Sequence, residues 1–138
     1  MDTAARQPLL KVEHLKQYFK VNKTFTVKAV DDISFEIFPG ETYGLVGESG
    51  SGKTTTGKAI MKICHTSGGE IYFDGVQVNR KMKGHELTEF RKNVQMIFQD
   101  PMASLNERAK VDYIISEGLY NFHAYKSEKE RKEKVAAA

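Results

Sequence analysis

The stretch Gly47-Glu48-Ser49-Gly50-Ser51-Gly52-Lys53-Thr54 decides the fold class, because it matches the phosphate-binding pattern G-x-x-x-x-G-K-[ST]. Its glycines let successive backbone N–H groups turn toward phosphate oxygens. The helix expected to follow directs its partly positive N-terminus at the same point. Lys53 adds a full positive charge for the β- and γ-phosphates, and the Thr54 hydroxyl is an oxygen ligand suited to Mg²⁺. The sequence therefore predicts a nucleotide phosphate site.

The residues on either side of this loop fit the same interpretation. Residues 42–46 are short and apolar and predict a buried strand, and residues 55–64 carry apolar side chains at helical spacing. Strand, loop and helix is the order that the pattern requires. The dinucleotide pattern G-x-G-x-x-G is not met, because Thr55 stands where its last glycine would be.

Further elements are predicted on both sides of the loop. Alternating apolar residues predict strands at 9–21, 25–29 and 33–37, before the loop. After it, the patterns predict a hairpin of 70–74 with 76–78, a helix at 87–92, a short buried strand at 94–98, a helix at 109–122, and a capping box opened by Ser127. This order of elements favours an α/β or α+β nucleotide-binding class.

Composition narrows the choice of class. Hydrophobic residues make up 40% and charged residues 28% of the 138 positions, with a mean hydropathy of -0.49, so a core and a soluble surface are expected. A net charge of +3 is too small to indicate a nucleic acid partner. The single cysteine, Cys64, cannot form an internal disulfide, which favours a cytosolic location.

Residues 96–101, Met-Ile-Phe-Gln-Asp-Pro, allow two interpretations. In one, Asp100 is a Walker-B acid that holds Mg²⁺ through water, and the chain is a self-contained small phosphotransferase or ATPase. Two neighbours argue against this Walker-B interpretation, because Gln99 interrupts the apolar run before Asp100 and Pro101 follows Asp100 directly. In the other, Gln99 is the functional residue, because an uncharged amide can touch Mg²⁺ and the attacking water and then release them.

Several stretches resemble the ATP-binding subunit of ABC transporters, from about residue 9 to the end of the chain. They are residues 12–15 (VEHL), 28–35 (KAVDDISF), 47–54 and 95–101 (QMIFQDP). Residues 98–106 (FQDPMASLN) more specifically resemble the oligopeptide/dipeptide importer branch, nearest its F-type ATPase subunit.

The resemblance implies ATP and Mg²⁺ as ligands and assigns roles to individual positions. Lys53 and Gln99 would be catalytic, and Thr54 and Gln99 would contact the metal. Phe19 would stack on adenine, with Tyr18 as the alternative and a core role for Phe19 also open. The implied nucleotide-binding positions are Phe19, Gly47, Glu48, Ser49, Gly50, Ser51, Gly52, Lys53, Thr54 and Thr55.

The family's L-S-G-G-Q signature, its Walker-B strand ending in Asp-Glu and its switch histidine are not found in the sequence. We therefore expect residues 9–138, after a loose end at 1–8, to be the N-terminal part of an ABC-type nucleotide-binding domain. The expected fold is α/β, a phosphate-loop NTPase core with an antiparallel β subdomain, incomplete on the C-terminal side. The 138-residue chain alone is expected to be inactive in ATP hydrolysis.

The resemblance also implies partners and a location. Transmembrane permease subunits would contact residues 100–110, and a second ATP-binding subunit, identical or different, would complete a dimer. The parent protein would couple ATP binding and hydrolysis to peptide uptake without touching the peptide itself. No nucleic acid partner is expected, and the location would be cytoplasmic, on the inner face of the cell membrane.

Overall fold

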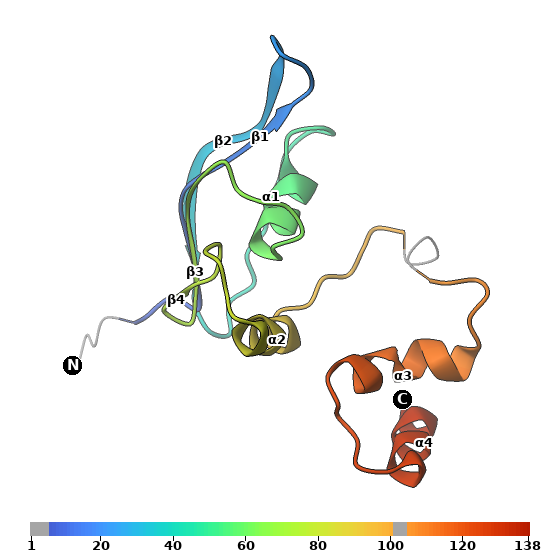
Figure 1. Cartoon of the computed structure of the whole chain (residues 1–138). Coiled ribbons are helices and arrows are strands. Elements are labelled where there is room, and N and C mark those ends of the chain that lie inside the picture. The colour runs from blue at the N-terminus through green and yellow to red at the C-terminus, as the bar shows by residue number, and fades with distance from the viewer. Residues whose placement is uncertain (1–5, 101–104) are drawn as a thin grey trace. The chain divides into compact units, whose positions relative to one another are not determined.

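The computed structural model describes residues 6–100 and 105–138, which form two compact units, Met1–Val94 and Gln95–Ala138 (Figure 1). Residues 6–8 of the expected loose end form neither helix nor strand, and the rest of that end lies outside the described residues.

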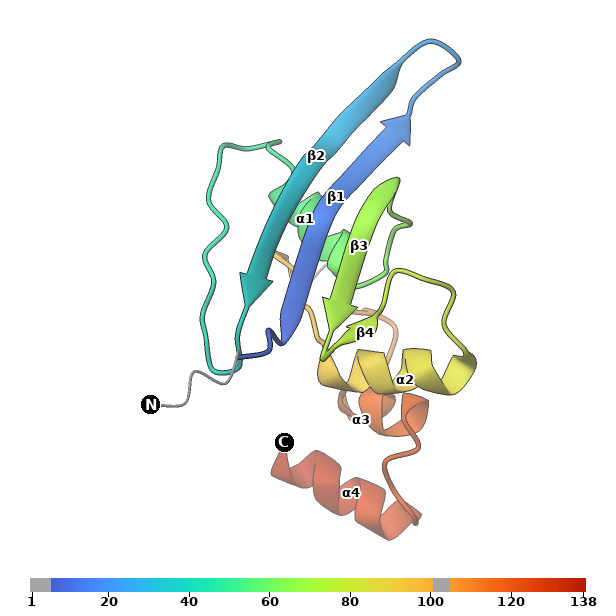
Figure 2. The ribbon, with the colours of Figure 1, turned by 90° about the vertical axis from the view of Figure 1, so that its left-hand side faces the viewer.

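The first unit is built on a four-stranded antiparallel sheet with strand order β2-β1-β3-β4 (Figure 2). Its strands are β1 (Leu10–Lys20), β2 (Thr26–Ile37), β3 (Gly68–Phe73) and β4 (Val76–Gln77). The predicted hairpin around Gly75 is therefore confirmed. Asn22 fixes the turn between β1 and β2, because its side-chain oxygen accepts hydrogen bonds from the N–H groups of Thr24 and Phe25 at 2.9 and 2.8 Å.

β2 is one continuous strand, so the prediction of separate strands at 25–29 and 33–37 was wrong. The register against β1 shifts between Val12 and Leu15, and again before Gln17. His14 and Asp32 both have positive φ, 50° and 61°, and the His14 Nδ1 lies 2.7 Å from an Asp32 carboxylate oxygen. These register shifts mark a β-bulge. A bulge changes which residues face the core without ending the strand, and it therefore interrupts the alternation of apolar and polar residues in the sequence.

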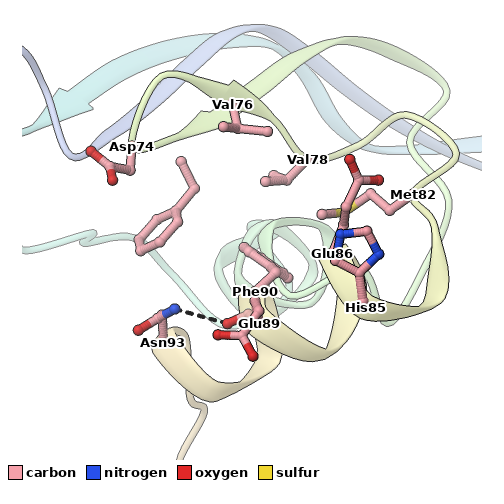
Figure 3. Close-up of a pocket in the computed structure, with 10 residues that line it drawn as sticks. Asp74, Val76, Val78, Met82, His85, Glu86, Glu89, Phe90 and Asn93 are labelled. Atoms are coloured by element: carbon pink, nitrogen blue, oxygen red, sulfur yellow. Dashed lines mark hydrogen bonds between the residues drawn. The ribbon is translucent and has the colours of Figure 1, made fainter.

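One helix covers a face of the sheet and a second packs at the β3–β4 hairpin. α1 (Lys53–Ile60) lies against β1 and β2, as Figures 1 and 2 show. α2 (Gly84–Asn93) is longer than the predicted helix at 87–92. Its Phe90 ring packs edge to face on the Phe73 ring, with 5.8 Å between the ring centres. Figure 3 shows Phe90 pointing toward Val76 and Val78 of the hairpin side. The buried core of the unit consists of Val12, Leu15, Val30, Ala59, Ile71, Val78 and Phe90.

Two predicted buried strands are absent. Residues 42–46 form no strand, with Val46 93% exposed, and residues 94–98 form none, with Ile97 94% exposed. Backbone groups of a buried strand need partners on neighbouring strands, and among residues 6–100 and 105–138 no strand pairs with either segment. α1 also ends at Ile60 rather than at residue 64, since Lys62 is left-handed with φ 56°.

The second unit contains α3 (Val111–Asn121) and α4 (Glu128–Ala137), which agree with the predicted helix at 109–122 and the predicted cap. The Glu130 N–H donates to the Ser127 hydroxyl at 3.2 Å, and the Glu130 carboxylate accepts from the Lys126 N–H at 2.8 Å. Buried Arg131 of α4 donates to both carboxylate oxygens of Asp112 and to the Ser116 hydroxyl on α3. These charge-assisted bonds hold the two helices together.

Candidate functional site: the phosphate loop

The start of α1 is fixed by a glycine that touches the sheet. Gly52 is the residue before the helix and has φ 93°. A Cβ added there would lie 2.1 Å from the Ala29 carbonyl oxygen of β2, which no side chain can accommodate without a backbone shift. Both the N–H and the hydroxyl of Thr56 bond to the Gly52 carbonyl, at 2.8 and 3.0 Å. The sheet therefore holds the N-terminus of α1 through the backbone itself.

Lys53 closes the loop that precedes the helix. Its ammonium donates to the carbonyl oxygens of Gly47 at 2.7 Å and Glu48 at 2.6 Å, with the Ser51 hydroxyl oxygen at 3.4 Å. The Ser51 N–H also bonds to the Glu48 carbonyl at 3.2 Å, forming a turn. The carbonyl oxygens of Gly47 and Glu48 thus accept hydrogen bonds from the Lys53 ammonium. Phosphate oxygens would accept these same bonds in a nucleotide complex. The pattern G-x-x-x-x-G-K-[ST] predicted the lysine but not this contact with its own loop.

The helix end itself offers donors for an anion. The first N–H groups of a helix have no partner within it, and in α1 they belong to Lys53, Thr54 and Thr55. The first turn carries no acidic side chain, so the positive end of the helix dipole is left for a ligand. Thr54 is exposed, which leaves its hydroxyl open to a metal ion.

These residues fit a polyphosphate with Mg²⁺. The backbone amides and Lys53 are donors suited to phosphate oxygens, and the Thr54 hydroxyl is the kind of hard oxygen ligand that Mg²⁺ takes. The rest of the loop, Gly47 to Ser51, is exposed and can rearrange around a ligand. Among the described residues no cluster of three or more histidine, cysteine, aspartate or glutamate side chains could hold a metal by itself. The metal would then be held jointly by the protein, the phosphates and water.

The aromatic candidates for adenine stacking differ in how they are engaged. Tyr18 donates its hydroxyl to the Asp31 carboxylate, and the Lys28 ammonium lies 5.2 Å from the centre of the Tyr18 ring. Phe19 stands opposite Val27 of β2 and is 43% exposed. An exposed ring is what stacking on a base requires, so Phe19 stays the better prediction of the two.

Gln99 and Asp100 belong to the second unit. Both are exposed and neither lies in a strand or a helix. The structure does not place this unit relative to the loop, so it does not bring Gln99 and Lys53 together. The Walker-B interpretation of Asp100 loses the strand that it needs, because residues 97–100 are not in a strand. Of the predicted permease-facing segment 100–110, residues 101–104 lie outside the described residues.

No helix in the described parts of the chain combines the length and the apolar character needed to cross a bilayer.

Comparisons with known proteins support the interpretation of the loop. The family model described as ABC transporter matches residues 30–138. An oligopeptide transport ATP-binding protein OppF of Streptococcus pyogenes serotype M1 is 54% identical over 129 residues, 94% of this chain and 42% of that protein. A dipeptide transport ATP-binding protein DppF of Lactococcus lactis subsp. cremoris is 47% identical, covering 92% of this chain and 41% of that protein.

Solved structures show the same fold. The ADP- and Pi-bound dimer of the ATP-binding cassette MJ0796 superposes with a TM-score of 0.75 at 23% identity, over 93% of this chain and 54% of that one. The cbiO1 protein of Clostridium perfringens, described as part of the cbiONQ ABC transporter complex, gives a TM-score of 0.67 at 28% identity, over 91% of this chain and 47% of that one.

The expected fold class, a phosphate-loop NTPase core that is not whole in these residues, is thereby confirmed. The chain spans about 42% of the length of the OppF relative that it matches. The relatives are named for peptide transport and do not favour a self-contained phosphotransferase. With four-fifths of its residues matched by the family model, the chain belongs to the ABC transporter family.

Proposed function

We propose that this chain is the N-terminal part of an ATP-binding subunit of a peptide importer, and that it binds Mg-ATP through residues 47–55. The observation that carries the proposal is the junction of Gly52, Lys53 and α1, where a positive side chain and three first-turn amides meet on a helix end fixed by the sheet.

In this proposal Lys53 exchanges the carbonyl oxygens of Gly47 and Glu48 for oxygens of the β- and γ-phosphates. The exchange replaces neutral acceptors by charged ones, and charge-assisted hydrogen bonds are roughly twice as strong as neutral ones. The amides of Lys53, Thr54 and Thr55 bind the same phosphates, and the Thr54 hydroxyl contacts Mg²⁺, which neutralises phosphate charge when bound. Phe19 stacks on the adenine, and Gln99 contacts Mg²⁺ and the attacking water.

The substrate and partners follow from the names of the relatives, which are oligopeptide and dipeptide transport proteins. The parent protein would couple ATP hydrolysis to uptake of such peptides from the cytoplasmic face of the membrane. It would pair with a second ATP-binding subunit, as the dimeric cassette neighbour does, and contact permease subunits through residues 100–110.

The experiment is a calorimetric titration of the 138-residue chain with Mg-ATP, beside the variants Lys53→Ala and Lys23→Ala. Lys23 lies in the exposed turn between β1 and β2 and provides the same loss of charge away from the loop. We expect Lys53→Ala to weaken binding by at least about tenfold, since a charged hydrogen bond contributes roughly 1.5–3 kcal/mol, and Lys23→Ala to bind as the unchanged chain does. Equal binding by Lys53→Ala and Lys23→Ala would refute the loop assignment.

Hydrolysis by the same chain should stay at background. Phosphate-loop catalysis needs a group that positions the attacking water, and these residues offer Gln99 without a Walker-B glutamate. Phosphate release is measured for the unchanged chain, Lys53→Ala and Asp100→Asn. Turnover well above the Lys53→Ala rate that disappears in Asp100→Asn would instead make Asp100 the metal-site acid.

A further inference from the structure

One pocket in the first unit is lined by residues that the proposed function does not use. It has a volume of about 430 Å³ and is formed by the end of α1, the loop that follows it and the residues after β4. Its charged and polar lining includes Lys62, Cys64, Asn79, Arg80 and Lys81. None of these residues belongs to the phosphate loop.

The pocket is lined by more positive than negative charge. Arg80 is paired with Glu86 at 3.2 Å. Neither Lys62 nor Lys81 takes part in any ion pair within residues 6–100 and 105–138. Burial, followed by the charges of Arg80 and Arg91, lowers the pKa of the Lys62 ammonium. This cation therefore lies in surroundings that lack a compensating negative group.

Lys62 is held in place but keeps a free donor. Its ammonium donates to the carbonyl oxygens of Val78 and Arg80, both at 2.6 Å. A lysine ammonium has three donors, so one remains for a ligand. The carbonyls at the end of α1 do not provide the missing negative charge, because those of Gly57, Lys58 and Ala59 accept from the N–H groups of residues 61–63.

Asn79, another lining residue, is held by three hydrogen bonds. The Asn79 amide nitrogen donates to the Thr66 hydroxyl at 3.1 Å and to the Gly69 carbonyl at 2.9 Å, and its oxygen accepts from the Ile71 N–H at 3.1 Å. Ile71 is fully buried in the core, so this network ties the pocket to the sheet. The Asn79 side of the pocket is therefore fixed by hydrogen bonds that include the sheet.

We infer that this pocket binds a small phosphate-bearing anion, with Lys62 and Lys81 as its cationic donors. The site is separate from the phosphate loop, and it would give the chain a second anion site whose occupancy does not depend on Lys53.

Cys64 provides a direct test, since it is the one cysteine of the sequence and lines the same pocket. Its rate of modification is measured with Ellman's reagent, which is an anion, and with 4,4′-dithiodipyridine, which is neutral. Relative to a small free thiol, the anionic reagent should be favoured by about threefold or more, because nearby uncompensated cations raise its local concentration. Inorganic phosphate, compared with potassium chloride at equal ionic strength, should slow the modification.

Four variants locate the effect. Lys62→Gln and Lys81→Gln should each reduce both the preference and the protection by phosphate. Lys81 is exposed and has no structural bond from its side chain among the described contacts, so it tests the proposal even where Lys62→Gln disturbs folding. Lys23→Gln removes the same charge at a distant turn, so it should change neither the preference for the anionic reagent nor the protection by phosphate. Lys53→Ala should keep the protection.

Glycerol 3-phosphate, tested beside inorganic phosphate, distinguishes an organic monoester from the free ion as the source, and protection by either supports the pocket. The proposal is overturned if neither protects, if protection survives in both Lys62→Gln and Lys81→Gln, or if it is lost in Lys53→Ala. That last outcome would place the phosphate effect in the loop.

Discussion

The antiparallel sheet and the short segment 42–46 that leads into the phosphate loop both carry runs of apolar residues, yet they differ in burial. In the sheet, Leu15 and Ile71 are fully buried. In the segment, Leu45 is 45% and Val46 93% exposed. The strands have hydrogen-bonded neighbours and the segment has none among the described residues. An apolar run becomes a buried strand only where another strand satisfies its backbone.

The phosphate loop connects this segment to α1, which packs on the sheet. On one side the segment is attached to the sheet by the stacked rings of Tyr43 and Phe35, whose centres are 5.1 Å apart. On the other side Gly52 packs directly on the Ala29 carbonyl. The loop is thus open toward solvent on its N-terminal side and rigid where it enters α1. This asymmetry leaves residues 47–51 free to adapt to a ligand while the helix end stays fixed.

The largest effect is expected from a charge placed inside the sheet. Ile71→Asp buries a carboxylate without a partner and should lower the free energy of unfolding by more than about 3 kcal/mol, which leaves little folded protein. Urea unfolding followed by circular dichroism measures it. Ile97→Asp, the same change at a side chain that is 94% exposed, is the matched control and should change stability little. Similar losses in both variants would contradict the assigned core.

The next effect concerns the rigid side of the loop. Gly52→Ala should lower the free energy of unfolding by about 1–3 kcal/mol through its left-handed backbone and the close Ala29 carbonyl, and it should weaken Mg-ATP binding. Gly50→Ala is the control, since Gly50 also has a positive φ, 81°, but an added Cβ meets nothing within 4 Å. The difference between the two variants isolates the contact with the sheet. Equal losses would mean that the backbone angle alone matters.

Much of this arrangement could be predicted from the sequence, and the exceptions share a cause. The loop, the hairpin around Gly75 and the cap at Ser127 depend on neighbouring residues, so local patterns identify them. Residues 42–46 and 94–98 would form strands only with partner strands elsewhere in the fold, and an apolar run does not reveal whether such partners exist. The continuity of β2 depends on the bulge of His14 against Asp32, and the bond of Lys53 to its own loop depends on a fold around it.

A smaller effect should come from the stacked pair that attaches the segment. Tyr43→Ala removes the contact with Phe35 and should lower the free energy of unfolding by about 0.5–1.5 kcal/mol, the range for an aromatic pair. Tyr43→Phe keeps the ring and serves as the control, with stability close to that of the unchanged chain. Thermal unfolding of the three proteins in parallel measures the difference. A full loss in Tyr43→Phe would assign the effect to the hydroxyl instead of the stack.

The smallest effect on stability is expected at Val46, whose side chain is almost fully exposed. Val46→Ser should change the free energy of unfolding by less than about 0.5 kcal/mol, as is usual for exposed positions. It should nevertheless reduce self-association, because an apolar segment with unpaired backbone groups can pair with another chain. Urea unfolding and sedimentation velocity measure the two properties on the same samples. A destabilisation above about 1 kcal/mol, at a protein concentration where the chain is monomeric, would mean that Val46 is packed in solution. The segment would then be buried like the strands, and its contrast with the sheet would disappear.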